Sequence, residues 1–118
     1  MTTYRGKCHC GAVRFAFRSE EPITTGIRCN CSICIRRGAP MSTTYFPREV
    51  FEQLEGLDRL TLYLWGDRDV NHYFCATCGV HPFHDVVGKE GRYRVNLGCI
   101  DNLDVLGLSI TLIDGRSY

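Results

Sequence analysis

The chain lacks both long hydrophobic runs and an excess of charge of either sign. No apolar stretch approaches the ~20 residues that span a bilayer. Residues 1–10 also lack the hydrophobic segment of a secretory signal, so we expect a cytoplasmic protein with no membrane partner. Lysine and arginine together number 14 against 13 aspartates and glutamates, a formal net charge of +1. The longest basic run, Arg36-Arg37, is too short for a nucleic-acid-binding patch, which argues against a nucleic-acid partner.

Internal repeats, linkers and low-complexity segments are also absent. Residues 1–118 are therefore expected to form one domain. A chain of this length buries only a modest core, so bound metal ions would add stability that the core alone does not supply. These features do not predict an oligomeric state.

Alternation of apolar and polar residues predicts that most of the chain forms β-strands. In residues 12–18, Val13, Phe15 and Phe17 would lie on one face of a strand and the arginines on the other. Strand-like segments also cover residues 22–28, 43–46, 60–65, 70–74, 80–87, 92–98 and 108–113, with a turn expected at Gly66-Asp67. Strands at such short and regular spacing predict a mainly β domain, of the all-β sandwich or barrel-like kind.

One segment has the pattern of a short helix instead. In residues 46–56, Pro47 suits a first helical position and Gly56 suits the end. The residues that would share one helical face are Val50, Phe51 and Leu54. We therefore expect one short helix at most, at this place in the chain.

Cysteine is abundant, with eight residues, and it is clustered. The clusters are Cys8-x-Cys10, Cys29-x-Cys31-x-x-Cys34 and Cys75-x-x-Cys78, and Cys99 stands alone. Thiolates two or three residues apart can bind one ion, and a reducing cytosol keeps thiols free. This pattern favours metal binding over disulfides, although the even count leaves disulfides open.

Cys8, Cys10, Cys75 and Cys78 together would make a closed, four-thiolate structural zinc site. The Cys75-x-x-Cys78 turn is followed by Gly79, which can take a positive φ where a Cβ would clash. Such a site would tie the N-terminal part of the chain to its middle. Spacing alone leaves open a different grouping that includes the other three clustered cysteines.

Cys29, Cys31 and Cys34 offer three thiolates, one fewer than a closed zinc site needs. Structural zinc sites are closed, whereas catalytic ones keep a position for water or substrate. We therefore expect a second, open zinc here, and the catalytic residues with it. Completion of the site by Cys99 or by a histidine stays open, and Cys99 is favoured as a packed core residue. An iron–sulfur cluster is a weaker alternative, because the spacing matches neither ferredoxin pattern.

Other side chains have two interpretations each. The histidines His81 and His84 suit structural hydrogen bonds, or a ligand or proton-shuttle role, and His72 suits a hydrogen bond to a zinc-bound sulfur or a surface position. The arginines near the cysteine triad would bind carboxylates or lie on a solvated face: Arg28, Arg36 and Arg37. Turn or cap positions are expected for Asp101 and Asp104. Core or pocket-wall positions are expected for Tyr63, Trp65 and Tyr73.

Four segments together closely resemble the glutathione-dependent formaldehyde-activating enzyme family, also called the CENP-V/GFA domain. They are G-K-C-H-C-G-A-V-R-F (6–15), C-N-C-S-I-C (29–34), Y-F-C-A-T-C-G-V-H-P-F (73–83) and V-N-L-G-C-I-D (95–101). The resemblance implies an Mss4-like fold of small antiparallel sheets. It implies a structural zinc on Cys8, Cys10, Cys75 and Cys78, and a labile, catalytic zinc on Cys29, Cys31 and Cys34.

The same resemblance implies a carbon–sulfur lyase activity, the reversible addition of glutathione to formaldehyde to give S-hydroxymethylglutathione. The expected cofactors are thus two zinc ions, with glutathione as co-substrate and a small thiol or aldehyde as partner. The alternative is a non-catalytic zinc-binding module, structural or partner-binding. That alternative predicts a fully coordinated second zinc with no pocket beside it.

Overall fold

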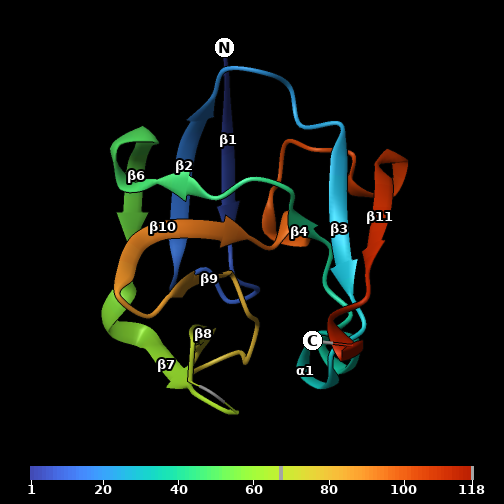
Figure 1. The fold of residues 1–118 in the computed structure, drawn as a ribbon. Helices are drawn as coiled ribbons and strands as arrows, with labels where there is room; N and C mark the ends of the chain where they lie inside the picture. Colours follow the sequence, from blue (N-terminus) through green and yellow to red (C-terminus); the bar gives the residue numbers. More distant parts are fainter. Residues whose placement is uncertain (67, 118) are drawn as a thin grey trace.

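The structure, a computed structural model, describes residues 1–66 and 68–117 and is mainly β, as predicted (Figure 1). Its strands are β1 (Thr2–Lys7), β2 (Arg14–Ser19), β3 (Thr25–Cys29), β4 (Met41–Ser42), β5 (Phe46–Pro47), β6 (Phe51–Glu55), β7 (Leu60–Tyr63), β8 (Val70–Cys75), β9 (Phe83–Val86), β10 (Lys89–Val95) and β11 (Ser109–Ile113). The α-helix among the described residues is α1 (Ser32–Arg37), and short 3-10 turns join several strands. Among these residues, no helix has the length and apolar character needed to cross a membrane.

The strands form three small sheets, with the orders β1-β2-β6, β5-β10-β9-β8-β7 and β11-β3-β4. Neighbouring strands are antiparallel except β11 and β3, which run parallel from Ser109 beside Thr25 to Ile113 beside Cys29. In Figure 1 these two strands stand side by side, with α1 and the C-terminus below them. The parallel pair therefore brings the end of the chain to the cysteine triad.

The core forms around β2, where alternation placed the apolar residues correctly. Phe15 and Phe17 are buried, and the Phe17 ring centroid lies 4.4 Å from that of Phe46 and 5.3 Å from that of Phe51. Ala16, between them, is also buried, because β2 is the central strand of its sheet. Aromatic rings at such separations add pairwise attraction to the burial of their area.

The prediction of a helix in residues 46–56 is wrong. That segment forms β5, a 3-10 turn and β6, and β6 pairs antiparallel with β2. Phe51 lies opposite Phe17 in this pairing, so the strand buries the same side chain that a helix would have buried. Tertiary pairing outweighs the local helical pattern here. Gly56 does end the element, with a φ of 80°.

The other strand predictions are confirmed, with strand ends that shift by up to three residues and with two differences. Residues 43–46 contribute only Phe46 to a strand, because the chain bends between β4 and β5. The strand β1 was not predicted, although its alternate residues Tyr4 and Gly6 are buried. Gly66 lies in a turn as expected, whereas Asp67 lies outside the described residues.

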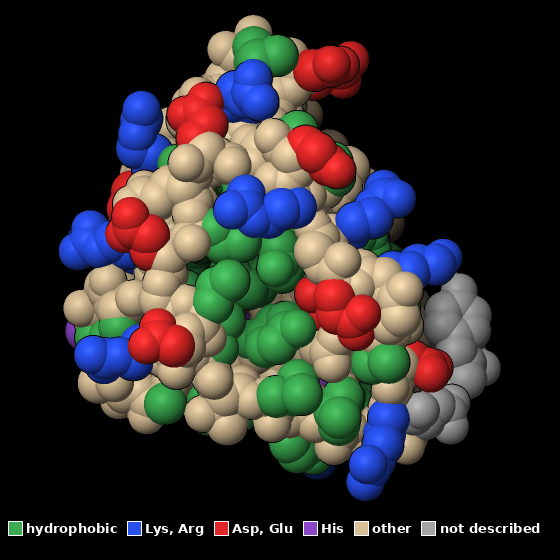
Figure 2. Space-filling view, turned by 90° about the vertical axis from the view of Figure 1, so that its left-hand side faces the viewer, with side chains coloured by type: hydrophobic (Ala, Val, Ile, Leu, Met, Phe, Trp, Pro, Cys, Tyr) green, Lys and Arg blue, Asp and Glu red, His purple; other side chains and the backbone are tan. Residues whose placement is uncertain are grey.

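The face turned toward the viewer in Figure 2 mixes basic and acidic side chains around a hydrophobic hollow. On this face, described basic residues do not gather into one continuous patch. The distribution agrees with the formal net charge of +1.

Candidate metal centres

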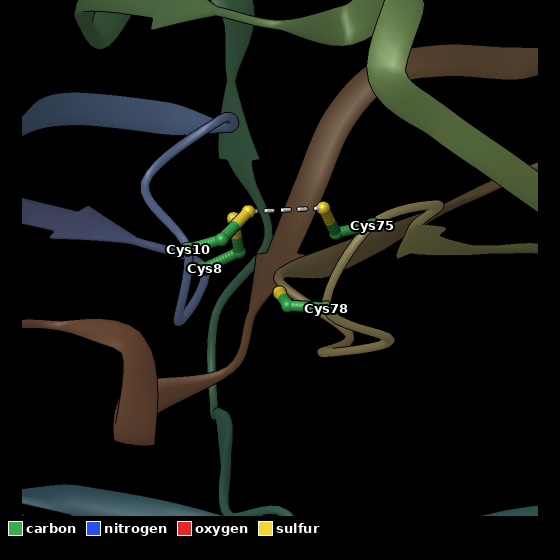
Figure 3. A group of neighbouring side chains, drawn as sticks. All are labelled: Cys8, Cys10, Cys75 and Cys78. Atoms are coloured by element: carbon green, nitrogen blue, oxygen red, sulfur yellow. Dashed lines mark hydrogen bonds between the residues drawn. The ribbon is translucent and has the colours of Figure 1, made fainter.

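Four cysteine sulfurs meet between two segments far apart in sequence (Figure 3). The Sγ atoms of Cys8, Cys10, Cys75 and Cys78 all lie within 4.8 Å of one another. The Cys8–Cys10 and Cys10–Cys75 sulfur separations are both 3.7 Å. A tetrahedral zinc with bonds of about 2.3 Å to sulfur places its ligands about 3.8 Å apart. The spacing of this four-cysteine cluster therefore fits a zinc ion.

Both halves of the four-cysteine cluster have the same backbone fold. The amide of Cys8 donates to the carbonyl of Val13 at 3.0 Å, and the amide of Cys75 donates to that of Val80 at 2.9 Å. Each bond thus joins residues five positions apart and closes a loop that holds two of the cysteines. In Figure 3 all four side chains project from these two loops toward a common centre.

A glycine in each loop makes the tight turn possible. The amide of Gly11 donates to the Cys8 carbonyl at 3.2 Å, and the amide of Gly79 donates to the Cys75 carbonyl at 2.8 Å. Their φ angles are 82° and 79°, a region in which a Cβ is strained. The positive φ predicted for Gly79 is confirmed, and Gly11 has the matching role in the first loop.

Backbone amides also point at the sulfurs of the four-cysteine cluster. The amide of Val13 lies 3.4 Å from Cys8 Sγ. Backbone amides of Cys10 and Val80 lower the pKa of Cys78 to about 6. Amide donors favour the thiolate, which is the form that binds metal.

A second group consists of Cys29, Cys31 and Cys34, whose sulfurs also lie within 4.8 Å of one another. Cys29 ends β3, Cys31 is the N-cap residue of α1, and Cys34 lies one turn into the helix. Residues three apart on a helix are neighbours, so α1 itself brings Cys31 and Cys34 together. The amide of Cys31 also lies 3.4 Å from Cys29 Sγ. This helix was not predicted, because six residues are too few to show a helical period.

The donor set of this cysteine triad would need a cation in order to exist as three thiolates. Burial, together with the Cys31 and Cys29 sulfurs, raises the pKa of Cys34 to about 12. Three thiolates at this spacing therefore do not coexist unless a positive ion binds them. Among the described residues, no further histidine, cysteine, aspartate or glutamate joins this group. The triad could hold a zinc ion with one ligand position left for another molecule.

Cys99 does not complete the triad. It is buried in a 3-10 turn (Leu97–Cys99) and belongs to the hydrophobic core. Burial, together with the Cys8 and Cys78 sulfurs and Asp101, raises its pKa to about 12. Cys99 therefore lies on the side of the four-cysteine cluster, and its favoured role as a packed core residue is confirmed.

The end of the chain closes over the triad. Asn30, between two of its cysteines, donates to the Asp114 carboxylate at 2.9 Å and accepts from the Arg116 amide at 2.9 Å. These bonds place Gly115 so close to Cys29 that a Cβ built on it would overlap the sulfur. In Figure 1 the C-terminus accordingly lies beside α1.

A cavity of about 460 Å³ opens beside the triad, and Cys29, Cys31 and Cys34 form part of its wall. Its other polar and aromatic lining side chains include Arg37, Tyr45, Trp65, His72, His84 and Arg94. A small-molecule site of this kind combines apolar walls with a few placed polar groups.

His72 lies inside this wall rather than on the surface, and it contacts no cysteine sulfur. Its Nδ1 lies 2.9 Å from a guanidinium nitrogen of Arg37, and its Nε2 lies 3.3 Å from the Trp65 indole nitrogen. Burial and the Arg37 charge lower the pKa of His72 to about 4, so the ring is neutral. A neutral imidazole has one lone-pair nitrogen and accepts from one of these donors at a time. Neither alternative left open for His72, a bond to a zinc-bound sulfur or a surface position, describes the contacts that it makes.

His81 and His84 are buried, and neither belongs to a metal-binding group. His81 Nδ1 bonds the backbone carbonyl of Tyr73, and His84 Nε2 lies 3.2 Å from the Tyr45 hydroxyl. Both histidines thus make the structural hydrogen bonds that the sequence favoured. The second ring nitrogen of each is buried without a partner among the described residues.

Of the three arginines expected near the triad, Arg37 alone lines the cavity beside it. Arg28 and Arg36 are exposed, and Arg36 donates to the Ser32 carbonyl on its own helix at 2.9 Å. Sequence reasoning missed Arg94, which reaches the cavity from β10 with its guanidinium 4.4 Å from the centre of the Tyr45 ring. The alternation of β10 could place Arg94 on one face of a strand. It could not show that this face borders the cavity beside the triad.

The remaining candidates lie mostly as expected. Asp101 is in a turn, and Asp104 precedes a 3-10 turn (Val105–Gly107) whose last amide bonds the Asp104 carbonyl. Trp65 lines the triad cavity, whereas Tyr63 is 49% exposed on β7. The Tyr73 hydroxyl donates to the buried Asp85 carboxylate at 3.0 Å.

These features define a mainly β protein with two cysteine clusters that could hold zinc, one closed and one open to a cavity. Residues 3–111 match the model of the glutathione-dependent formaldehyde-activating enzyme family, and the chain belongs to that family. It is also similar to a crystal structure of a Rhodobacter sphaeroides protein, with 34% sequence identity and a TM-score of 0.73. That similarity covers 91% of this chain and 99% of the other.

Proposed function

We propose that the protein is a zinc-dependent carbon–sulfur lyase acting on the adduct of glutathione with an aldehyde such as formaldehyde. The proposal rests on one observation above all. The three sulfurs of Cys29, Cys31 and Cys34 converge at the wall of a cavity with no fourth ligand among the described residues. An incomplete ligand set facing a cavity is the arrangement of catalytic rather than structural zinc.

In this proposal the two clusters have different tasks. Cys8, Cys10, Cys75 and Cys78 hold a structural zinc, since their four sulfurs leave no ligand position free. Cys29, Cys31 and Cys34 hold the catalytic zinc, which when bound supplies a Lewis acid for a thiol or for an aldehyde oxygen. We further propose that residues 1–118 form one domain and that the protein works in the cytoplasm, where its thiols stay reduced.

The reaction needs no nucleophile from the protein. A carbon–sulfur bond forms between the thiol sulfur and the aldehyde carbon, the thiol loses its proton, and the aldehyde oxygen gains one. The reverse step breaks the same bond and returns the proton to sulfur. The chain's own contribution is to hold the two reactants beside the triad and to limit water there.

Named side chains of the cavity fit these tasks. Ile27, Ile33 and Met41 provide apolar wall next to the triad. Tyr45 and His84, joined at 3.2 Å, place a hydroxyl and an imidazole in the same wall. Together they allow a polar adduct to be oriented while most of its surface is shielded.

The test measures exchange between free formaldehyde and its glutathione adduct by ¹³C exchange NMR, with and without the zinc-loaded protein. We expect the protein to accelerate exchange and Cys34→Ser to abolish the acceleration. Cys99→Ala is the matched control, because Cys99 belongs to neither cysteine cluster. Exchange at the uncatalysed rate, in a protein holding two zinc ions, would instead identify a non-catalytic zinc-binding module.

A further inference from the structure

Two guanidinium groups, those of Arg37 and Arg94, line the cavity beside the triad, and neither is paired with a carboxylate of the described residues. Within residues 1–66 and 68–117, the ion pair present joins Arg18 and Glu52 instead. Asp69 also lines the cavity, but it is exposed and forms no ion pair with either arginine. Buried or half-buried charges in proteins are normally paired.

Each arginine also has a buried N–H donor that finds no acceptor among the described residues. One terminal nitrogen of Arg37 and Nε of Arg94 are buried and have no partner among the described residues. Unpaired buried donors are rare in native proteins, and an ordered water, an ion or a functional role normally accounts for them. Guanidinium groups only donate, so the missing partner must be an acceptor.

The remaining contacts of the two arginines hold them in place. Arg37 donates to Nδ1 of His72 at 2.9 Å. Arg94 donates to the Thr43 carbonyl at 3.0 Å, and its guanidinium stacks over Tyr45 at 4.4 Å. Both groups are therefore fixed before any ligand arrives, which reduces the entropy lost on binding.

The charges of the cavity wall bear on the sign of the ligand. Three thiolates and one divalent zinc sum to a single negative charge, and Arg37 and Arg94 supply two positive ones. The histidines add nothing, because burial keeps His72, His81 and His84 neutral by lowering the pKa of each. With the exposed Asp69 counted as well, the described side chains of the cavity wall have no net charge, so it is the two guanidinium groups without a carboxylate partner that favour an anion.

We infer that Arg37 and Arg94 form a subsite for a carboxylate of the substrate, so that the adduct bound at the triad is an anion. Guanidinium is the group best matched to a carboxylate, because its fork of N–H donors meets both oxygens. The carboxylate belongs either to the thiol, as in glutathione, or to the aldehyde, as in glyoxylate. The identity of the adduct rests on the proposed function, whereas the anion subsite rests on the two arginines.

Isothermal titration calorimetry on the zinc-loaded protein separates these sources. The thiol arm compares glutathione with its diethyl ester, and the aldehyde arm compares glyoxylate with glycolaldehyde. Within each pair only the carboxylate differs, so the ratio of affinities isolates it. Arg37→Gln and Arg94→Gln are the test variants. Arg36→Gln and Arg92→Gln are the matched controls, since both residues are exposed neighbours on the same elements.

We expect each test variant to weaken binding of the free acid about 10- to 100-fold in one arm, and to leave binding of the counterpart without a carboxylate unchanged. The arm that responds identifies the half of the adduct that carries the carboxylate. Equal losses for the acid and for the counterpart without a carboxylate, or no loss in either arm, would overturn the subsite. Arg37→Lys and Arg94→Lys, which keep the charge, should recover part of the affinity, and thermal melting checks that every variant folds.

Because binding is measured without turnover, the two proposals fail separately. If binding depends on the arginines but formaldehyde exchange is not accelerated, the carboxylate subsite is supported and the lyase assignment is refuted. A protein that accelerates exchange with no arginine dependence keeps the lyase assignment and loses the subsite.

Discussion

Gly115 packs directly against the sulfur of Cys29, although 85 residues separate them in the chain. The contact depends on Asn30, whose side chain bonds both Asp114 and the Arg116 amide. The triad is therefore shaped by two segments, the β3–α1 corner and the end of the chain. Only a residue without a side chain leaves Cys29 free to point toward Cys31 and Cys34.

Replacement of Gly115 by alanine should weaken zinc at the triad. The added Cβ would overlap Cys29 Sγ and displace it from its partners. We expect a loss of about 10- to 100-fold in affinity, as for other changes around metal ligands. Competition with a chromophoric chelator measures it, and the four-cysteine cluster of the same molecule is the internal control. If zinc affinity at both sites is unchanged, the C-terminal segment can move away from Cys29 without a loss of zinc binding.

Single cysteine replacements should separate stability from function. Cys75 is fully buried within the four-cysteine cluster, whereas Cys34 is only half-buried. Structural zinc contributes about 10–16 kcal/mol in zinc-finger peptides, as much as the whole stability of about 5–15 kcal/mol of a typical domain. We therefore expect Cys75→Ser to unfold the protein, and Cys34→Ser to lose one zinc and keep the fold. Circular dichroism and zinc analysis check both, and a Cys34→Ser protein that unfolds would contradict the assignment.

Local patterns in the sequence predicted the strands and the grouping of the clustered cysteines because both signals are local. Cysteine spacing of two or three residues constrains where sulfurs lie, and the two clusters in the structure contain the cysteines expected. Alternation around Phe15 and Phe17 likewise placed the core strand. Whether those sulfurs bind zinc stays a prediction.

Features that depend on distant partners were not predictable. The segment containing Phe51 has a helical pattern, yet it pairs with β2, which the local sequence does not encode. Arg94 reaches the triad cavity through the packing of β10, and Gly115 reaches Cys29 through the parallel pairing of β11 with β3. Residue spacing along the chain does not predict such contacts, because they arise from packing between segments that are distant in sequence.

Three buried histidines should make stability fall as pH falls below about 6.5. Burial, with Arg37, lowers the pKa of His81 to about 3 and of His72 to about 4, and burial also lowers that of His84. Above pH 6.5 each ring is neutral in both states, so stability is constant with respect to them. Between that value and the folded-state pKa the unfolded chain binds more protons, so acid favours unfolding.

The slope should be about 1.4 kcal/mol per pH unit for each histidine. Urea unfolding between pH 7.5 and 5 measures it, and protonation of the zinc ligands adds to the same trend. The stability of His84→Gln should therefore depend on pH less steeply than that of the parent, by about one proton. A His84→Gln slope equal to that of the parent would show that the buried ring is not what senses acid.

Trp65 should report binding at the triad, because it is the single tryptophan and lines the same cavity. Its side chain is 39% exposed, and its indole nitrogen lies 3.3 Å from His72 Nε2. A bound ligand would replace water at the ring, so we expect glutathione to shift the emission maximum to shorter wavelength. The fluorescence midpoint should equal the calorimetric dissociation constant, and Cys34→Ser should weaken both together. If the calorimetric titration saturates while the Trp65 emission does not change, glutathione binds elsewhere on the protein, away from the three cysteines.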